Sequence, residues 1–402
     1  MSRLEELIQQ HCPDGVEWKS FFDVCDFVRG ITYNKQQEAR TEVDAYKVLR
    51  ANNITLNLNT LNFDDVKFVV NDVKVKPTQF LYRGDILMCA GSGSKEHIGK
   101  VAYINEDMDY TFGGFMSVVR CKDVLLPRFM FHILTGGLFT QHLEREIKSS
   151  TINNINNQVM QSLSIPVPPL PVQEEIVRIL DNFAELQAEL QAELQKRLQQ
   201  YNYYRDKLLS FNDLNGGGYA VSVEWKKLGD VCTVFTGGEV PDNSIKGSEP
   251  QGDMIYPIWG NGKDVYGFAT TYQIDQDAVC VSSIGANTGA IFFHKAFFTP
   301  IIRLKVLIPK DDNLSARYLY HALSVVGFDV KKSSVPNMNA NEVKQKLIPI
   351  PPIEEQKRIT NILDRFDALT TDITAGLPAE IEARRKQYEY YRDQLLTFKQ
   401  KA

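Results

Sequence analysis

Hydrogen-bonding side chains are concentrated in two pairs of polar loops. Residues 91–97 precede Gly99 and residues 282–288 precede Gly289, at matching places in the two halves of the chain. Residues 149–157 and 333–341 form a second matching pair, rich in serine and asparagine. Asparagine, serine and lysine on such loops can reach base edges and phosphates. Surface loops of any protein contain the same residue types, so the loops alone do not decide the ligand.

If the ligand is a nucleic acid, we expect these loops and one earlier lysine to supply the contacts. The candidates are Lys35, Ser92, Ser94, Lys95, His97, Asn153, Asn154, Asn156 and Asn157 in the first half and Ser283, Asn287, Thr288, Lys331, Lys332 and Asn337 in the second. The net charge of the chain is −5, and no segment is basic overall. A nucleic-acid ligand therefore requires basic groups gathered on one face, or a partner that supplies attraction to phosphate.

Enzyme signatures fail at the spacing that each requires. Residues 93–101 imitate a phosphate-binding loop, but the closing serine or threonine is missing. Residues 13–19 imitate a metal-dependent nuclease site, but the second Glu-Trp-Lys, at 224–226, has no preceding Pro-Asp. The six histidines show no metal-ligand spacing. We expect no catalytic residue, no metal site and no cofactor in this chain.

The chain contains a duplicated unit. Residues 200–211 read QYNYYRDKLLSF and residues 387–398 read QYEYYRDQLLTF, and nine of these twelve positions are identical. Glu-Trp-Lys and a Pro-x-Pro-Pro segment also occur in both halves, whereas residues 33–71 have no evident counterpart. The order is therefore variable, fixed, variable, fixed. Joining the two ends would place a long helix before both variable parts, so we expect the chain ends to lie close together.

The fixed parts predict two long helices. One runs over 173–211, with acidic residues in its first turn and apolar residues at helical spacing, and it contains three copies of Ala-Glu-Leu-Gln at 184–195. The other begins at 353 and is interrupted at Gly376-Leu377-Pro378, because proline removes a helical hydrogen bond. Each helix has one apolar stripe, so we expect the two to pair in antiparallel orientation.

The variable parts read as α+β domains. Strand patterns occur at 66–70, 85–89, 99–104, 117–121, 278–281, 290–293 and 301–306, and helical patterns occur at 127–134 and 314–326. We expect a first globular domain with an N-terminal helix over 1–163, a central helix over 164–212, a second domain over 213–347 and a C-terminal helix over 348–402. The fold class is thus α+β, with two globular domains, two long helices and a pseudo-two-fold, circular repeat.

Composition sets the outer limits. The 402 residues are enough for two domains with helical connectors, and no apolar stretch is long enough to span a membrane. The N-terminus lacks the features of a secretory signal, and the six cysteines form no Cys-x-x-Cys pair, so we expect reduced thiols and a cytoplasmic location. Cys25 and Cys232 occupy equivalent positions, which favours a buried packing role for both.

Two divergent domains alternating with two matching helices resemble the specificity subunit of type I restriction–modification systems. The most specific shared phrases are Pro-Pro followed by Gln-Glu-Glu-Ile at 173–176 or Ile-Glu-Glu-Gln at 353–356, and Gly-Leu-Pro-Ala-Glu-Ile-Glu at 376–382. Val-Glu-Trp-Lys at 16–19 and the repeated tyrosine block fit as well. The first helix departs from the pattern, because it carries the Ala-Glu-Leu-Gln array in place of Gly-Leu-Pro.

The resemblance implies a division of labour. Each variable domain would be a target recognition domain for one half of a split double-stranded DNA sequence, and the helices would space the domains and dock two methyltransferase subunits. Restriction subunits would join them, and S-adenosylmethionine, ATP and Mg would be used by the partners. The tyrosine blocks become the candidate docking and spacer residues: Tyr203, Tyr204, Arg205, Asp206, Tyr390, Tyr391, Arg392 and Asp393.

Two other classes remain open on the sequence alone. The chain could be a helical scaffold that holds two protein-binding domains, or a self-sufficient DNA modification enzyme. In the DNA-reading class, the Ala-Glu-Leu-Gln array would set the distance between half-sites. One tetrapeptide copy adds roughly 6 Å and about 40° of net twist to a helix, and a base pair adds a comparable twist and roughly 3.4 Å.

Overall fold

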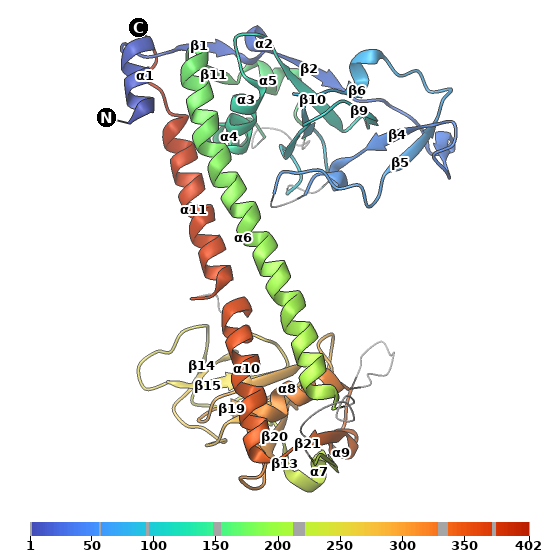
Figure 1. The fold of residues 1–402 in the computed structure, drawn as a ribbon, viewed down its shortest axis with the longest axis vertical. Helices are drawn as coiled ribbons and strands as arrows, with labels where there is room; N and C mark the ends of the chain where they lie inside the picture. Colours follow the sequence, from blue (N-terminus) through green and yellow to red (C-terminus); the bar gives the residue numbers. More distant parts are fainter. Residues whose placement is uncertain are drawn as a thin grey trace. The chain divides into compact units, whose positions relative to one another are not determined.

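The computed structural model describes residues 2–55, 58–93, 96–147, 154–211, 222–328, 337–371 and 375–401. The chain divides into two compact units: unit 1 is Met1–Leu190 with Ile381–Ala402, and unit 2 is Gln191–Glu380. Each unit contains one strand-rich domain and parts of the long helices (Figure 1). The predicted α+β class, with two globular domains and long helices, is therefore confirmed.

Two sheets form the strand-rich domain of unit 1. The first, in the order β2-β10-β7-β8, consists of β2 (Cys25–Arg29), β10 (Met116–Cys121), β7 (Ile86–Cys89) and β8 (Val101–Tyr103). The second, in the order β3-β5-β4-β9-β6, consists of β3 (Glu38–Ala39), β5 (Lys67–Val70), β4 (Ala45–Leu49), β9 (Met108–Phe112) and β6 (Phe80–Leu81). The four strands predicted in this region coincide with β5, β7, β8 and β10.

Short helices complete the domain of unit 1. They are α1 (Arg3–His11), α2 (Phe21–Val24), α3 (Pro127–Thr135), α4 (Gly137–Ile147) and α5 (Asn157–Gln161), with the 3-10 turns η1 (Lys35–Gln37), η2 (Ala51–Asn53) and η3 (Pro77–Gln79). Phe21, Phe129 and Phe139 bring three of these helices into one buried core with Ile86 and Val119 of the first sheet. Cys25 and Cys232 are buried, as predicted.

Unit 2 repeats the first sheet with different residues. Its order β13-β20-β17-β18 is built from β13 (Cys232–Thr236), β20 (Lys305–Pro309), β17 (Ala278–Val281) and β18 (Ile291–His294). A second sheet contains β14 (Ser244–Lys246), β16 (Gly267–Ala269), β15 (Tyr256–Trp259) and β19 (Thr299–Pro300), and the helices are α7 (Leu228–Val231), α8 (Ala316–Val326) and α9 (Ala340–Gln345). β15 pairs with β19 in parallel, as β4 pairs with β9, so β4 within residues 33–71 has a structural counterpart that the sequences conceal.

The strand predicted at 301–306 in unit 2 is wrong in its first four residues. Residues 301–304, predicted as strand, form a turn between β19 and β20. Ile302 and Arg303 in this turn have φ angles of 53° and 60°, in the left-handed region. An apolar, β-branched run predicts a strand from side-chain type alone, and it cannot show that the surrounding chain holds the backbone in another conformation.

The repeated motifs pair with one another at the base of each domain. β1 (Glu17–Ser20) pairs with β11 (Ser164–Val167), which places Trp18 opposite Pro166. β12 (Glu224–Lys227) pairs with β21 (Leu347–Ile350), which places Trp225 opposite Pro349. In each domain, the Glu-Trp-Lys motif and the first two residues of the Pro-x-Pro-Pro motif therefore lie in the two paired strands next to the start of a long helix.

The long helices are α6 (Leu170–Ser210), α10 (Ile353–Thr371) and α11 (Leu377–Leu395). α6 starts before the predicted residue 173, because a proline in the first turn of a helix lacks only an N–H that would have no helical partner. In unit 1, Phe183 of α6 stacks on Tyr391 of α11 at 5.6 Å. In unit 2, Tyr204 of α6 stacks on Phe366 of α10 at 5.8 Å.

The helices pair in antiparallel orientation within unit 1 (Figure 1). Early residues of α6, including Ile176, share a core with Leu396 beyond the end of α11, whereas the later Phe183 contacts Tyr388. The predicted antiparallel pairing is confirmed here, and so is the break near Gly376, since α10 and α11 are separate helices.

The two end segments of the chain meet in unit 1. The Val16 N–H donates to the carbonyl of Lys399 at 2.9 Å, and the Lys401 N–H donates to the carbonyl of Val16 at 2.9 Å. Gly15 has φ +105°, and a Cβ there would lie 2.5 Å from the Lys399 carbonyl oxygen, so the close approach requires glycine. The predicted proximity of the ends is confirmed.

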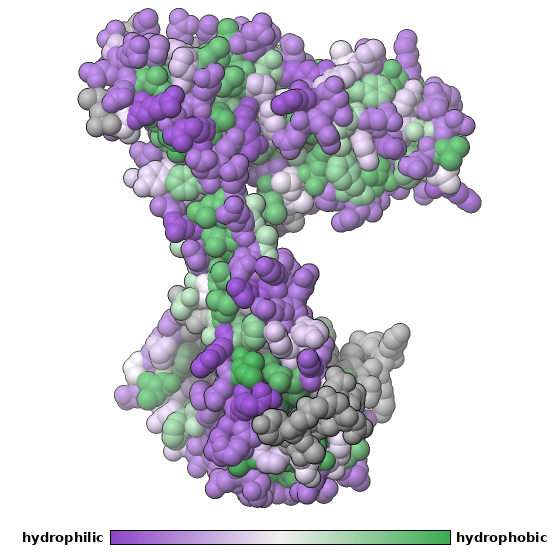
Figure 2. Space-filling view, viewed as in Figure 1, coloured by the Kyte–Doolittle hydropathy of each residue, from purple (hydrophilic) through white to green (hydrophobic). Residues whose placement is uncertain are grey.

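The surface agrees with the composition. Hydrophilic side chains predominate on the face shown in Figure 2, and hydrophobic ones form smaller patches between them. Among the described residues, no helix combines the length and apolar character needed to cross a membrane.

Candidate nucleic-acid interfaces

A cavity of about 890 Å³ opens on the strand-rich domain of unit 1. Its lining combines charged, aromatic and amide side chains: Arg29, Tyr33, Arg50, Asn52, Ser92, His97 and Phe115, together with backbone of Gly91, Gly113 and Gly114. These come from the end of β2, the segment after β4, the loop after β7 and the turn between β9 and β10. Sequence positions from 29 to 115 thus converge on one concave surface.

Arg29 is the uncompensated cation of this cavity. Its Nε donates to the Gly114 carbonyl at 3.0 Å and its Nη2 donates to Asn154 Oδ1 at 3.2 Å, while the side chain stays exposed. No carboxylate of the described residues lies within ion-pair distance of it. Arg50, by contrast, is paired with Asp65 at 2.6 Å. Arg29 therefore keeps its charge available to an anionic or hydrogen-bond-accepting ligand.

Phe115 is the exposed aromatic ring of the cavity, with 73% of its surface accessible. Its carbonyl accepts from the N–H groups of Ala90 and Gly91, both at 2.9 Å, so the turn is fixed against the β7 loop. Nearby, burial raises the pKa of Tyr33, so its hydroxyl stays protonated and able to donate. Nδ1 of His97 is buried with no partner in the described part of the chain.

The structure brings some predicted residues of unit 1 together and separates others. Gly91 forms a β-bridge with Asn154, so the two polar loops meet, and Ser92, His97 and Asn154 lie beside Arg29. Asn156 caps α5 by accepting from the Val159 N–H at 3.0 Å, Asn157 is the first residue of that helix, and Lys35 is exposed on η1 outside the cavity lining. Ser94, Lys95 and Asn153 lie outside the described residues.

In unit 2 the corresponding loops also meet. Ile284 forms a β-bridge with Asn337, matching the bridge between Gly91 and Asn154. The exposed Asn287 donates from Nδ2 to the Asn261 carbonyl at 3.2 Å, and Thr288 donates to the Gly285 carbonyl at 2.7 Å. Lys331 and Lys332 lie outside the described residues.

The prediction that Ser283 contacts DNA is wrong. Its side chain is fully buried, and its hydroxyl donates to the Arg303 carbonyl at 2.6 Å. A buried hydroxyl with a backbone partner stabilises the turn that carries Arg303 and cannot reach DNA without opening the fold. We therefore leave Ser283 out of the proposed DNA-contacting set.

Arg29, Phe115, Asn261 and Arg303 were not expected from the sequence. Arg29 follows the repeated Asp-Val-Cys motif by four residues, but its equivalent in the second half is Thr236, so sequence repetition gives no signal for it. The pair of glycines at 113–114 was the available signal for Phe115, because two glycines before an apolar residue mark a tight turn that exposes it.

Each domain is fastened to the long helices by the same ionic anchor. In unit 1, Arg128 Nε and His132 Nε2 both lie 2.8 Å from Asp181 Oδ1. In unit 2, Arg317 and His321 lie 2.8 and 2.7 Å from Asp364 Oδ1. The Arg-x-x-x-His spacing common to both halves was the sequence signal for these anchors.

The anchor histidines are buried and neutral. Burial lowers the pKa of His132 and that of His321, although the neighbouring aspartate opposes the shift in each case. A neutral His132 that donates from Nε2 to Asp181 accepts at Nδ1, and the Tyr388 hydroxyl lies 3.1 Å from that atom. These side chains therefore hold the domain to the helices and do not form a titrating site at neutral pH.

A buried glutamine next to each anchor satisfies three backbone groups. Gln173 Nε2 donates to the carbonyls of Pro168 and Val124, at 2.7 and 2.9 Å, and its Oε1 accepts from the Leu126 N–H at 2.8 Å. Gln356 makes the equivalent three bonds in unit 2. The glutamine of each Glu-Glu motif is thus a structural residue that binds the helix start to the domain.

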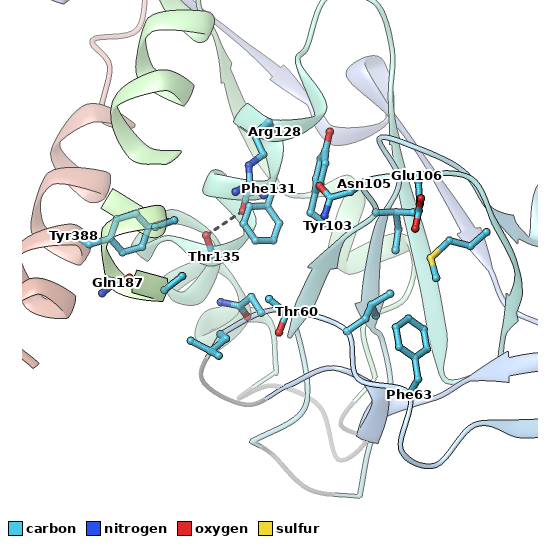
Figure 3. Close-up of a pocket in the computed structure, with 17 residues that line it drawn as sticks. Thr60, Phe63, Tyr103, Asn105, Glu106, Arg128, Phe131, Thr135, Gln187 and Tyr388 are labelled. Atoms are coloured by element: carbon cyan, nitrogen blue, oxygen red, sulfur yellow. Dashed lines mark hydrogen bonds between the residues drawn. The ribbon is translucent and has the colours of Figure 1, made fainter. Parts of the chain in front are cut away.

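A second cavity, of about 510 Å³, lies beside the anchor of unit 1 (Figure 3). Tyr103, Phe131 and Tyr388 line it, and the Arg128 guanidinium lies 5.0 and 4.7 Å from the ring centres of Tyr103 and Phe131. Arg128 is already engaged by Asp181 and by both rings, so its charge is less available to a ligand than that of Arg29.

The tyrosine blocks expose the same side chains on both helices. Tyr203 and Tyr390 are 60% and 62% exposed, and Tyr204 and Tyr391 are 39% and 42% exposed. Arg205 bonds Asp206, and Arg392 bonds Asp393, which also accepts from the Gly137 N–H at 3.0 Å. Each helix therefore presents one solvent-facing tyrosine and one that also stacks on the neighbouring helix.

Comparison with known proteins decides the family. A sequence profile described as the type I restriction modification DNA specificity domain matches residues 13–200 and 221–383. The chain belongs to this family. It is 38% identical over 330 residues to the specificity subunit of the type I restriction enzyme EcoR124I/EcoR124II of Escherichia coli, an alignment that covers 73% of this chain and 78% of that subunit.

Further relatives agree with this assignment. A putative type I restriction enzyme specificity subunit of Haemophilus influenzae is 30% identical over 358 residues, covering 82% of this chain and 86% of that protein. The crystal structure of a type I S subunit from M. genitalium superimposes with a TM-score of 0.58 at 16% identity, covering 95% of this chain and 96% of that one. A chain from a study of type I R-M complex assembly gives 0.58 at 17%, covering 96% and 98%. At these identities the structures show a shared fold.

Proposed function

We propose that this chain is the DNA-recognition subunit of a type I restriction–modification complex, and that each unit reads one half of a bipartite duplex target. The observation that carries this proposal is that the two units share one backbone arrangement but expose different side chains at equivalent positions. The units share a sheet order and an anchor to the helices, but the equivalent turns present Phe115 in unit 1 and Arg303 in unit 2. Two similar frames with different exposed side chains suit the reading of two different base sequences.

Candidate DNA contacts lie on the concave face of unit 1 and on the matching loops of unit 2. Arg29, Ser92, His97 and Asn154 are the proposed contacts of unit 1 around the cavity, and Asn287, Thr288 and Asn337 are those of unit 2. Lys35, Asn156 and Asn157, and the residues outside the described segments, remain expectations from the sequence. The net charge of −5 fits an assembly in which partners supply part of the attraction to phosphate.

The chemistry would belong to the partners. Methyltransferase subunits would bind S-adenosylmethionine and modify adenine, and restriction subunits would use ATP and Mg. The exposed tyrosines at 203 and 390 occupy equivalent places on two helices, so we propose two equal docking surfaces and two methyltransferase subunits per chain. Amphipathic tyrosine side chains are common at such interfaces.

The Ala-Glu-Leu-Gln array is proposed to set the length between half-sites. Two recognition domains entering DNA about one helical turn apart, roughly 34 Å, would leave about 5 to 8 base pairs unread. Deleting residues 188–191 removes roughly 6 Å of helix and should shorten that spacer by one base pair. If the deletion variant still methylates DNA and the spacer length is unchanged, the array does not set the distance between half-sites.

The decisive experiment for the function is a comparison of adenine methylation across a genome with and without this gene. Loss of one bipartite motif on deletion, and its return on complementation, supports the proposal. An unchanged methylome contradicts it. Methyl-donor binding by the purified chain alone would instead favour a self-sufficient modification enzyme.

A further inference from the structure

The turn between β19 and β20 of unit 2 holds two consecutive side-chain-bearing residues in the left-handed region. Ile302 has φ 53° and Arg303 has φ 60°. This conformation is uncommon for any residue but glycine, and it is least favourable for a β-branched residue such as isoleucine. Strained backbone of this kind persists only where the surroundings determine it, and it is concentrated at functional sites.

The surroundings do determine this turn. Asn261 Nδ2 donates to the Ile302 carbonyl at 2.5 Å, and Ser283 Oγ donates to the Arg303 carbonyl at 2.6 Å. Asn261 Oδ1 in turn accepts from the Ser283 N–H at 2.8 Å. The N–H groups of Ile302 and Arg303 donate to the carbonyls of Gly238 and Gly237, at 2.8 and 3.1 Å. The backbone that carries the Arg303 side chain is therefore fixed on both sides.

Arg303 itself is exposed, and no carboxylate in the described ranges pairs with it. Two residues on, Lys305 is only 6% exposed, and its Nζ donates to Thr236 Oγ1 at 3.3 Å. Burial lowers the pKa of Lys305, and the nearby charge of Arg303 lowers it further. A rigid turn, a free guanidinium and a second cation behind it make a surface that favours an electron-rich acceptor.

Strand register identifies the residue of unit 1 that is equivalent to Arg303. Ile31 bridges Gly113 in parallel, and Gly238 bridges Ile301 in parallel. Counting two residues on from Gly113 and from Ile301 makes Phe115 the equivalent of Arg303. The same backbone position thus presents an exposed aromatic ring in unit 1 and an exposed guanidinium in unit 2. The two units share the strand register around this turn but differ in the side chain that it exposes.

We propose that Arg303 is a specificity-determining residue that recognises a guanine in the half-site read by unit 2, with Asn261 and Ser283 as its positioning residues. The inference rests on the proposed DNA-reading function and adds the residue and the base. The planar guanidinium can donate two parallel hydrogen bonds to O6 and N7 of guanine in the major groove, the commonest specific contact between arginine and a base. A fixed backbone holds this fork in one orientation.

The test uses the full chain together with its methyltransferase subunits in a host that lacks the corresponding adenine methylation. The methylated motif is read from host genomic DNA for the wild type and for Arg303→Gly, Arg303→Gln and Ile302→Gly. Glycine at 303 removes the guanidinium and adopts the left-handed backbone conformation without steric cost. Glutamine tests a switch, because its amide pairs with adenine. Ile302→Gly keeps Arg303, relieves the strained isoleucine and serves as the matched control.

We expect Arg303→Gly to lower discrimination at one G·C pair of one half-site by roughly 5- to 150-fold, with the other half-site unchanged. Arg303→Gln should shift the preference at that pair toward adenine, and Ile302→Gly should keep the wild-type motif. A uniform loss of methylation with the motif intact would make Arg303 a phosphate contact and overturn the inference. An unchanged motif and extent in both Arg303 variants overturns it as well. A wild-type complex that methylates no bipartite motif contradicts the proposed function itself.

Discussion

The anchor of unit 1 yields the sharpest stability prediction. In Asp181→Ala, Arg128 and the fully buried His132 both lose the carboxylate that lies 2.8 Å from each of them. Hydrogen bonds to charged groups contribute about 1.5–3 kcal/mol each, and Asp181 is 29% exposed, which weakens its pairs. We expect unit 1 to lose about 2–4 kcal/mol of its free energy of unfolding.

The measurement must resolve the two units, because a chain with two compact units need not unfold in one transition. Hydrogen–deuterium exchange followed by mass spectrometry reports on α3 of unit 1 and α8 of unit 2 separately. A loss of 2–4 kcal/mol corresponds to roughly 30- to 700-fold faster exchange of the slowest α3 amides, with α8 unchanged.

Asp364→Ala is the matched control in unit 2. Arg317 also lies 2.9 Å from Asp367, so it keeps one carboxylate after the substitution, and the loss there should be smaller and confined to α8. Unaltered α3 exchange in Asp181→Ala would refute the assignment of the anchor as a stabilising contact. Equal acceleration in both units would refute its local action.

Three further outcomes follow from the structure. Burial lowers the pKa of His294 to about 4, so as the pH falls below the ordinary histidine pKa the unfolded chain binds more protons than the folded one. The free energy of unfolding of unit 2 should therefore fall by about 2 kcal/mol between pH 7 and pH 5. Thermal unfolding of His294→Phe at the two pH values should show a smaller loss. Gln173→Leu leaves three backbone groups without partners and should cost unit 1 about 3 kcal/mol, measured by denaturant titration, with Gln356→Leu as the counterpart for unit 2. If the exposed tyrosines dock methyltransferase subunits, Tyr203→Ala or Tyr390→Ala should each remove one subunit from the complex at limiting concentration, by light scattering, and equal stoichiometry to wild type would contradict that role.

Periodicity and repetition in the sequence predicted most of the arrangement of the long helices and the chain ends. The helix break at Gly376, the paired helices and the meeting of the chain ends follow from patterns that recur at fixed separations. The turn at 301–304 could not be predicted, because the contacts that hold it come from Asn261 and Ser283, distant in sequence. Local residue type favours a strand there, and tertiary hydrogen bonds determine the outcome.

The contact surface was harder to predict for a related reason. Residue type makes every polar side chain of the loops a candidate, yet Ser283 is buried and Asn156 caps a helix. The exposed Phe115 and the free Arg29 belong to types that sequence patterns assign to cores or to ion pairs. Exposure and the absence of a neighbouring carboxylate depend on the folded environment, and the two halves differ at these positions, so repetition gives no signal.

The composition of unit 1 has a consequence for synthesis. Unit 2 is one continuous stretch, Gln191–Glu380, whereas unit 1 needs Ile381–Ala402 to supply Tyr388, Leu396 and the backbone partner of Val16. A chain emerging from the ribosome can therefore complete its second unit while the first still lacks its last segment. During that interval Phe183 of α6 lacks the two tyrosine rings, Tyr388 and Tyr391, that it contacts in the complete unit.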